Sequence, residues 1–354
     1  MGDPWRFGHL IQGMPPSDIA YTTFIRNRSK KSVALDLKQP EAQAALHKLV
    51  EGADVFLTNS PLTVQRACAH TYEAISEVNP GIVYAWVNGF GLAGPDKDLP
   101  GFDVTAWYAR SGVAEQFRGK DANPVMQPIG LGDTFTATSL FAGIMTGLFI
   151  RERTGKGTRV STSLMNNGLW ANSSMMQAAL VGAPPMKKYL REEWPQAIMG
   201  AIYKTRDERF LIINEMNPNN AAGVLEAVDA DHLKTDERFT TAELRAKYAR
   251  ALLDELQKVI GNMELAEVEM RFKKCGVNHG VMQTAAECAN DEHMIANGCF
   301  PEVEGCDGIR TIDNPIQIEG MEKVRPQKPP AIGGDSMAEL LAIGYSEDEV
   351  RDMA

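Results

Sequence analysis

ADVFLTNSPLTVQRACAHTYEAISEVNPGIVYAWVNGFG, residues 53–91, is the stretch of sequence that decides the fold class. Its apolar run Asp54–Leu57 predicts a buried strand that ends at Thr58. Residues 72–78 predict a helix, which the Asn-Pro-Gly triplet at 79–81 stops, and residues 82–87 predict the next strand. Strand, helix and strand in this order make a β-α-β unit, which predicts a parallel sheet.

A similar pattern precedes this stretch. Val33–Leu37 predicts a short strand, and Ala42–Val50 carries an apolar stripe at helical spacing. The repetition predicts an α/β fold in which helices cover the faces of a Rossmann-like parallel sheet. Ligands of such sheets collect at the carboxyl ends of the strands, where we expect Asn59 and the turn at 88–91.

The second half of the chain predicts a long buried helix and then a smaller unit. Residues 134–150 are apolar and rich in small side chains, and they precede a strand at 158–163 and a helix at 164–181. A Gly-Ala-Pro-Pro linker at 182–185 separates this part from a smaller α+β unit at about 200–289. That unit is expected to contain a strand at 210–214 and charged amphipathic helices at 242–260 and 265–274.

Composition narrows the class of protein. A length of 354 residues predicts two domains, and 44% hydrophobic with 23% charged residues is ordinary for a soluble globular protein. The net charge of −10 argues against nucleic acid as a partner. The longest apolar run, Ser139–Ile150, is too short to span a membrane, and Met1–Arg6 has no signal-peptide pattern. We therefore expect a cytoplasmic protein without membrane contact.

The cysteines and histidines predict neither a disulfide framework nor a metal site. The five cysteines include no CxxC pair, and the six histidines do not share metal-ligand spacing. Cys275 and His279 could form a dyad, but the glycines beside them favour a turn between a helix and a strand.

Asp133 is the main candidate for a catalytic residue. It lies in the segment PIGLGDT, residues 128–134, where a glycine-rich turn runs into the long apolar helix, and no His, Cys or other carboxylate is near it in sequence. A carboxylate presented in this way can attack an activated carbonyl and hold the acyl group covalently. The alternative is structural, because Asp before a helix commonly caps free backbone N–H groups.

An ordered set of segments resembles the family III CoA-transferases, the CaiB/BaiF family of formyl-CoA, carnitine and phenyllactate CoA-transferases. The resemblance covers essentially the whole chain, and residues 94–103 with 130–133 are most similar to the phenyllactate and 2-hydroxyacyl branch. The segments are RNRSKKS with LDLK at 26–38, ADV with Asn59, VNGFG with Gly94-Pro95, PGFD at 100–103, Gly132-Asp133, TGKG at 154–157, and Pro329-Pro330 through Gly344-Tyr345.

The resemblance implies a domain organisation and a dimer. Residues 1–185 and 300–354 would form the large CoA-binding α/β domain, and 195–295 the small α+β domain of an interlocked homodimer. Relatives carry about one more β-α-β unit before the position where this chain starts (such a unit runs to about 30 residues). We therefore expect an N-terminally truncated chain without that first unit.

The resemblance also implies the reaction and the site. Asp133 would attack an acyl-CoA, form a mixed anhydride and then an aspartyl-CoA thioester, from which CoA passes to a small carboxylic acid, possibly a 2-hydroxy acid. The helix N-terminus would keep the Asp133 carboxylate ionised, and Gly132 would let a bulky thioester approach. The acyl-CoA is a substrate, and no permanently bound cofactor or metal is expected. The implied CoA and substrate contacts are Leu35, Asn59, Ser60, Arg66, Gly101, Phe102, Asp103 and Gly132.

Three other functions remain as alternatives. Racemases of the same family pair the aspartate with a histidine, because moving a proton between two faces needs two bases. Phe102 stands at that position in the Gly101-Phe102-Asp103 triplet, which favours transfer over racemisation. A truncated relative without catalytic activity is the second alternative. A nicotinamide dehydrogenase is the weakest, since no GxGxxG follows a strand.

Overall fold

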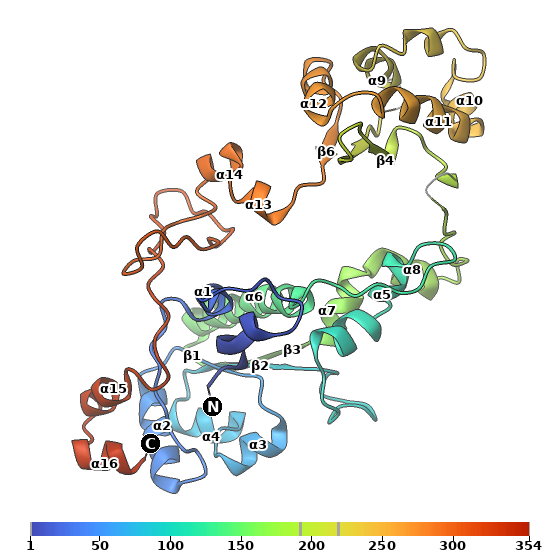
Figure 1. Cartoon of the computed structure of the whole chain (residues 1–354). Coiled ribbons are helices and arrows are strands. Elements are labelled where there is room, and N and C mark those ends of the chain that lie inside the picture. The colour runs from blue at the N-terminus through green and yellow to red at the C-terminus, as the bar shows by residue number, and fades with distance from the viewer. Residues whose placement is uncertain (1, 191–192, 218–219, 354) are drawn as a thin grey trace. The chain divides into compact units, whose positions relative to one another are not determined.

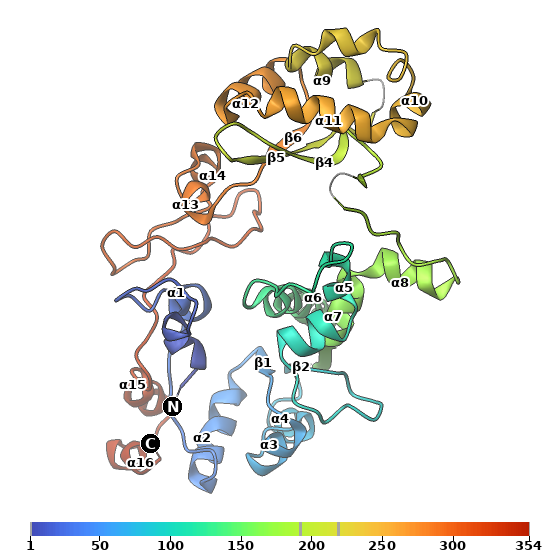
Figure 2. The same cartoon turned by 45° about the vertical axis from the view of Figure 1, so that its right-hand side comes forward.

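The computed structural model describes residues 2–190, 193–217 and 220–353 of the chain (Figures 1 and 2). These residues fold into two compact units, each with its own sheet. The first unit consists of Met1–Gln116, Val125–Gly182 and Ala289–Ala354, and the second of Phe117–Pro124 and Ala183–Cys288.

The first unit is built on a parallel sheet of strand order β1-β2-β3. The central strand β2 (Val83–Asn88) pairs in parallel with β1 (Val55–Thr58) and with β3 (Thr158–Ser163). Tyr84 of β2 is buried and stacks on Phe56 of β1 at 5.4 Å between ring centroids. The prediction of a parallel α/β sheet from the β-α-β pattern is confirmed.

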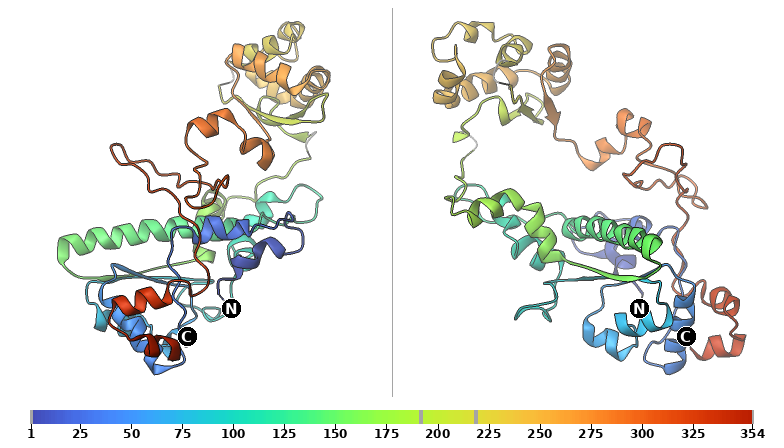
Figure 3. Two further views of the ribbon diagram at one scale, coloured as in Figure 1. Left: turned by 60° about the vertical axis from the view of Figure 1, so that its left-hand side comes forward. Right: turned by 180° about the vertical axis from the view of Figure 1, so that it is seen from behind.

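Helices cover both faces of this sheet (Figure 3). Helix α6 (Leu131–Thr154) lies on β2 and β3, and α4 (Tyr72–Val78) with α2 (Pro40–Glu51) lies on the opposite face. Gly147 of α6 is buried against Val83 and Thr158, the first residues of β2 and β3. The end of α6 therefore lies over the beginnings of the strands, which places the first turn of α6 toward their carboxyl ends.

Val33–Leu37 is not a strand, contrary to the sequence prediction. The backbone N–H of Ala34 donates to Ser336 Oγ at 2.8 Å, and that of Asp36 donates to the Met353 carbonyl oxygen at 3.1 Å. The segment is therefore bound to the C-terminal part of the chain and not to a sheet. Leu35 packs in the same place, in a cluster with α2 and the helices α15 (Ser336–Ala342) and α16 (Glu347–Asp352).

A π-helical segment, η2 (Asp103–Ala109), follows the loop after β2. It packs on α7 (Leu164–Ala171), where a Cβ on Gly168 would lie 2.3 Å from the Trp107 carbonyl oxygen. The predicted single helix 164–181 is divided at Asn172, which separates α7 from α8 (Ser173–Leu180). The other elements of this unit are η1 (Pro4–Leu10), α1 (Tyr21–Asn27), α3 (Leu62–Ala67), α5 (Val113–Phe117) and α14 (Glu292–Ala296).

The second unit is an antiparallel sheet covered by helices, in agreement with the predicted α+β unit. Strand β5 (Phe210–Asn214) pairs with β4 (Met199–Lys204) and β6 (His279–Val281). The predicted helix 242–260 is divided at Tyr248. His279 lies 2.8 Å from the Val277 carbonyl oxygen through Nδ1, a contact that leaves a Cys275–His279 dyad without support. The helical elements are α9 (Ala221–Ala227), η5 (Asp231–Lys234), α10 (Ala242–Lys247), α11 (Ala249–Ile260), α12 (Leu265–Lys274) and α13 (Ala285–Cys288).

Helix α6 is longer than the sequence predicted. With 24 residues it is the one helix in the described parts of the chain that is long and apolar enough to cross a membrane. The sequence predicted a buried helix over 134–150 and weighed only the apolar run 139–150 as a membrane span. The prediction that this helix is buried is wrong, because only 17% of its most apolar stretch is buried. In the structure the helix packs on β2 and β3 through its small residues, as a covering helix of an α/β sheet does.

The packing of α6 on the sheet can be tested at two of its glycines. A Cβ on Gly147 would lie 2.8 Å from Cγ1 of Val83, a buried β-branched side chain that cannot easily move. We expect Gly147→Ala to lower the free energy of unfolding in urea by about 1–2 kcal/mol, because overpacking outweighs the helix propensity of alanine.

Gly143→Ala is the matched control, since a Cβ there would meet Val160 at an ordinary 3.8 Å. This change should be neutral or raise the free energy of unfolding by up to about 1 kcal/mol. If Gly147→Ala proved as stable as Gly143→Ala, the described contact between α6 and the sheet would be wrong.

Candidate active site

The turn before α6 sets the position of Asp133. Gly130 adopts the left-handed conformation, with φ of 77°, at the N-cap position of α6. Glycine is the residue that takes this conformation without strain. Asp133 is then the third residue of the helix and not its cap, so the structural alternative considered for it is wrong.

Asp103 holds this turn. Its carboxylate oxygen Oδ2 accepts a hydrogen bond of 2.8 Å from the backbone N–H of Gly130, and the side chain is buried. Asp103 is the first residue of η2, so the bond ties η2 to the start of α6. It also brings the Asp103 carboxylate near Asp133. From the sequence alone, Asp133 had been expected to have no other acid close to it.

Gly132 has a packing role in the structure. A Cβ at this position would lie 2.6 Å from Cγ of Trp107, so only glycine lets the first turn of α6 rest on the indole ring. The sequence had given a different reason for this glycine, the approach of a bulky thioester. Its contact with substrate stays a prediction, whereas its contact with Trp107 is a feature of the fold.

Arg26 is a site residue that the sequence reasoning missed. Its guanidinium lies 4.1 Å from the centroid of the Trp5 ring, and Nη2 comes so close to Gly130 that a Cβ there would be 2.6 Å away. Arg26 stood at the start of the first resemblance segment, but nothing in sequence indicated that α1 reaches the turn before α6. Only the fold shows that this cation is near the candidate nucleophile.

These charges act on Asp133 in opposite directions. Burial is the largest effect and raises the pKa of the Asp133 carboxyl, the negative charge of Asp103 raises it further, and the Arg26 guanidinium lowers it. The net result is a pKa above the ordinary value of 3.8. The expectation that the helix N-terminus keeps the Asp133 carboxylate ionised stays a prediction. A raised pKa makes the carboxylate a stronger base and a better nucleophile.

Several buried polar atoms around the same turn have no hydrogen-bond partner among the described residues. They are Nε of Arg26, Nε1 of Trp107, both amide atoms of Gln127, and Oγ1 of Thr136. Within the described residues, no donor bonds the Asp133 carboxylate either, so the carboxylate is free to react. Buried polar groups without partners are rare in proteins and commonly mark a place where a ligand or water binds.

The other predicted contacts lie in different surroundings. Asn59, directly after β1, and Arg66, on α3, are exposed, whereas the Ser60 carbonyl oxygen accepts hydrogen bonds from Gln65 and Trp86. Leu35 packs with the C-terminal helices, as described above. Their contact with CoA stays a prediction.

Gly101 and Phe102 lead into η2. Gly101 lies directly on Gly89, since a Cβ on Gly101 would be 2.6 Å from the Gly89 Cα, and this contact fixes the loop after β2. The Phe102 side chain is 67% exposed. A hydrophobic ring presented to solvent next to Asp103 is suited to contact a ligand, and that role remains a prediction.

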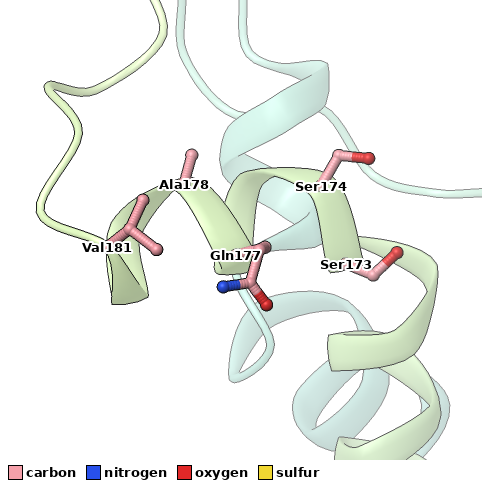
Figure 4. Close-up of a pocket in the computed structure, with 5 residues that line it drawn as sticks. All are labelled: Ser173, Ser174, Gln177, Ala178 and Val181. Carbon is pink, nitrogen blue, oxygen red and sulfur yellow. The ribbon is translucent and has the colours of Figure 1, made fainter.

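The described parts of the first unit include two hollows of similar size. One, of about 510 Å³, is a shallow depression on α8 lined by Ser173, Ser174, Gln177, Ala178 and Val181, without a titratable group (Figure 4). The other, of about 530 Å³, lies beside α1 and includes Trp5, Arg26 and Ile129 in its wall. The second adjoins the turn that carries Asp133, whereas the first does not. No cluster of three or more metal-ligating side chains occurs in the described residues.

Comparisons with known proteins agree with this geometry. The family model of CoA-transferase family III matches residues 1–336. The (R)-2-hydroxy-4-methylpentanoate CoA-transferase of Clostridioides difficile is 26% identical over 96% of this chain and 85% of its own length. The cinnamoyl-CoA:phenyllactate CoA-transferase of Clostridium sporogenes is 28% identical over 99% of this chain and 87% of its own. In fold, the chain resembles a CaiB/BaiF family protein from Brucella suis, with a TM-score of 0.82 at 22% identity over 91% of this chain and 84% of the other.

The raised pKa predicts an effect on stability. Because the Asp133 carboxyl holds its proton more tightly in the folded than in the unfolded chain, its ionisation favours unfolding at pH 7. We expect Asp133→Asn to raise the free energy of unfolding at pH 7 in urea titrations. The gain should shrink as the pH falls through the pKa of the folded protein and vanish below the ordinary value of 3.8.

Asp121→Asn is the control for this experiment, because Asp121 is an exposed acid on a turn that precedes the segment 128–134. It should change stability little at either pH. A loss of stability in Asp133→Asn at pH 7 would contradict the electrostatic description of the site.

Proposed function

The chain belongs to CoA-transferase family III, and from that premise we propose that it moves CoA from an acyl-CoA to a small carboxylic acid through covalent intermediates on Asp133. The observation that carries the proposal is the state of this carboxylate. It is half-buried, its pKa is raised, and no described residue donates a hydrogen bond to it. A carboxylate used for structure would be hydrogen-bonded.

The first half of the reaction loads the enzyme. An Asp133 carboxylate oxygen attacks the thioester carbonyl carbon, the C–S bond breaks, and the CoA thiolate leaves a mixed anhydride behind. The thiolate then attacks the carbonyl carbon of Asp133, which releases the donor acid as a carboxylate. Asp133 is now a thioester with CoA, and no proton has been gained or lost.

The second half repeats these steps with the acceptor. The acceptor carboxylate attacks the aspartyl thioester, CoA leaves as thiolate, and a new anhydride forms. The thiolate attacks the acceptor carbonyl, which gives the new acyl-CoA and restores Asp133. Negative charge develops on a carbonyl oxygen in each step, and in this proposal Arg26 and backbone N–H groups of the first turn of α6 stabilise it.

The substrates and assembly that we propose follow the relatives named above. The acceptor would be a small carboxylic acid of the 2-hydroxy class, as the names of the Clostridioides and Clostridium enzymes state for those proteins.

We also propose a cytoplasmic homodimer with a large domain from 1–185 and 300–354 and a small domain from 195–295. The exposed apolar side chains Phe141, Met145 and Phe149 along α6 support burial of that face by a partner.

The covalent role of Asp133 can be tested by trapping. After incubation with cinnamoyl-CoA or acetyl-CoA, hydroxylamine should convert Asp133 to a hydroxamate and borohydride should reduce its thioester, both detected by peptide mass mapping. Asp133→Ala should lose CoA transfer by about a thousandfold or more, the loss expected for a covalent nucleophile.

Asp121→Asn should keep both the label and the transfer, because this acid is exposed and lies outside the turn before α6. A label on another residue, or an Asp133→Ala protein that transfers CoA at the normal rate, would refute the role of Asp133.

The racemase alternative predicts a different outcome. Exchange at the α-carbon needs a second base beside Asp133, and Phe102 has no ionisable group. We expect no deuterium from solvent at the α-position of a 2-methylacyl-CoA after long incubation, as measured by mass spectrometry. Exchange at the rate of enzyme turnover would show that the chain is a racemase.

A further inference from the structure

The larger cavity beside α1 has a wall of unusual composition. Most of the described side chains around it are apolar, and the charged groups among them are arginines and not acids. The lining residues are Trp5, Met14, Ser17, Ile19, Tyr21, Thr22, Phe24, Ile25, Arg26, Ile129 and Gly308 through Ile312. A volume of about 530 Å³ is within the range of small-molecule sites.

Hydrogen bonds join three of the segments that form this wall. Thr22 Oγ1 of α1 donates to the Trp5 carbonyl oxygen at 2.6 Å. Arg28, one residue beyond α1, donates to Thr311 Oγ1 at 3.2 Å and also to the Ile312 carbonyl oxygen. The wall is therefore held in place by side-chain contacts between parts of the chain that are far apart in sequence, as expected of a preformed site.

Arg26 is the group in the wall that can recognise a ligand. It lies over the Trp5 ring, and its Nε is buried without a hydrogen-bond partner. The other arginine, Arg310, already donates to the Ala289 carbonyl oxygen at 3.2 Å. A guanidinium held against an indole ring, with donors that no described residue engages, is suited to bind a carboxylate through two hydrogen bonds.

The cavity adjoins the turn that carries Asp133. Ile129 in its wall is the residue before Gly130, and Arg26 touches Gly130. Asp133 follows on the first turn of α6. A carboxylate bound at Arg26 would therefore lie beside the turn that carries Asp133, with its remaining atoms among the apolar side chains.

We propose that this cavity is the acceptor subsite, in which Arg26 binds the carboxylate of the acid and the apolar wall takes a bulky branched or aromatic side chain. The inference rests on the proposed function, since it assigns the acid that attacks the Asp133 thioester. A dicarboxylic acid would place its second charge among apolar side chains without a partner, which is unfavourable. The subsite therefore selects monocarboxylic acids with an apolar tail.

Binding to the full chain tests the proposal without requiring turnover. 4-Methylpentanoate and succinate are similar in length and branching. The two terminal methyl groups of 4-methylpentanoate stand where succinate has the two oxygens of its second carboxylate. By titration calorimetry, with and without free CoA, we expect 4-methylpentanoate to bind at least about tenfold more tightly than succinate. The use of an Asp133→Asn protein beside the wild type separates binding from chemistry.

Three variants locate the site. Arg26→Gln should weaken binding of 4-methylpentanoate about tenfold or more, since a charge-assisted pair is lost. Ile312→Trp, at a side chain 60% exposed, should weaken it similarly by filling the cavity while leaving the core intact. Arg110→Gln is the control, because Arg110 is a surface residue paired with Asp96 and should leave binding unchanged.

The outcomes distinguish this proposal from the proposed function. Equal or tighter binding of succinate, an unchanged affinity in Arg26→Gln and Ile312→Trp, or no binding of 4-methylpentanoate at millimolar concentration would overturn the acceptor subsite, even if Asp133 is labelled by acyl-CoA. Selective binding that depends on Arg26 would support it, even if labelling failed and the covalent role of Asp133 were wrong.

Discussion

The hydrogen bond from the Gly130 amide to the Asp103 carboxylate is the contact on which the site depends. It fixes a left-handed turn to the first residue of η2, and Gly132 then seats the first turn of α6 on Trp107 of the same segment. Because η2 packs on α7 and α6 packs on the sheet, the turn is held from both sides. Asp133 is presented by a rigid junction of two elements, which would suit the role of nucleophile that we propose for it.

This arrangement lowers the stability of the folded chain and, at the same time, makes the Asp133 carboxylate a stronger base. A neutral hydrogen-bond acceptor could also bind the Gly130 amide. Asp103 instead places a negative charge near the Asp133 carboxylate. Together with burial, this raises the pKa of Asp133, while Arg26 acts against it. The unpartnered polar atoms of Trp107, Gln127 and Thr136 add to the cost. Proteins tolerate such local conflicts chiefly at functional sites, where a stronger nucleophile or a bound ligand compensates for them.

The sequence was informative where structure is local and less so where it depends on distant partners. The β-α-β pattern of residues 53–91 predicted β1, α4 and β2 because apolar periodicity and the Asn-Pro-Gly stop act within a few residues. The prediction of a strand at Val33–Leu37 was wrong because the hydrogen-bond partners of this segment, Ser336 and Met353, lie about three hundred residues away in sequence. Asp133 could be selected from its turn and helix, but its neighbours Asp103 and Arg26 are brought to it only by the packing of η2 and α1.

The glycines of the resemblance segments show why such segments indicate a family and not a substrate. Gly89 and Gly101 touch each other through their backbones, and Gly132 touches Trp107, so these residues build the frame around Asp133. The side chains that line the adjoining cavity, among them Ile25 and Ile309, lie mostly outside those segments. A frame that is common to many acyl transfers can therefore keep its sequence while the wall beside it changes. If the cavity is the acceptor subsite that we propose, selectivity for one acid over another depends on its wall. The charge and apolar surface of that wall arise only when the chain folds and brings its segments together.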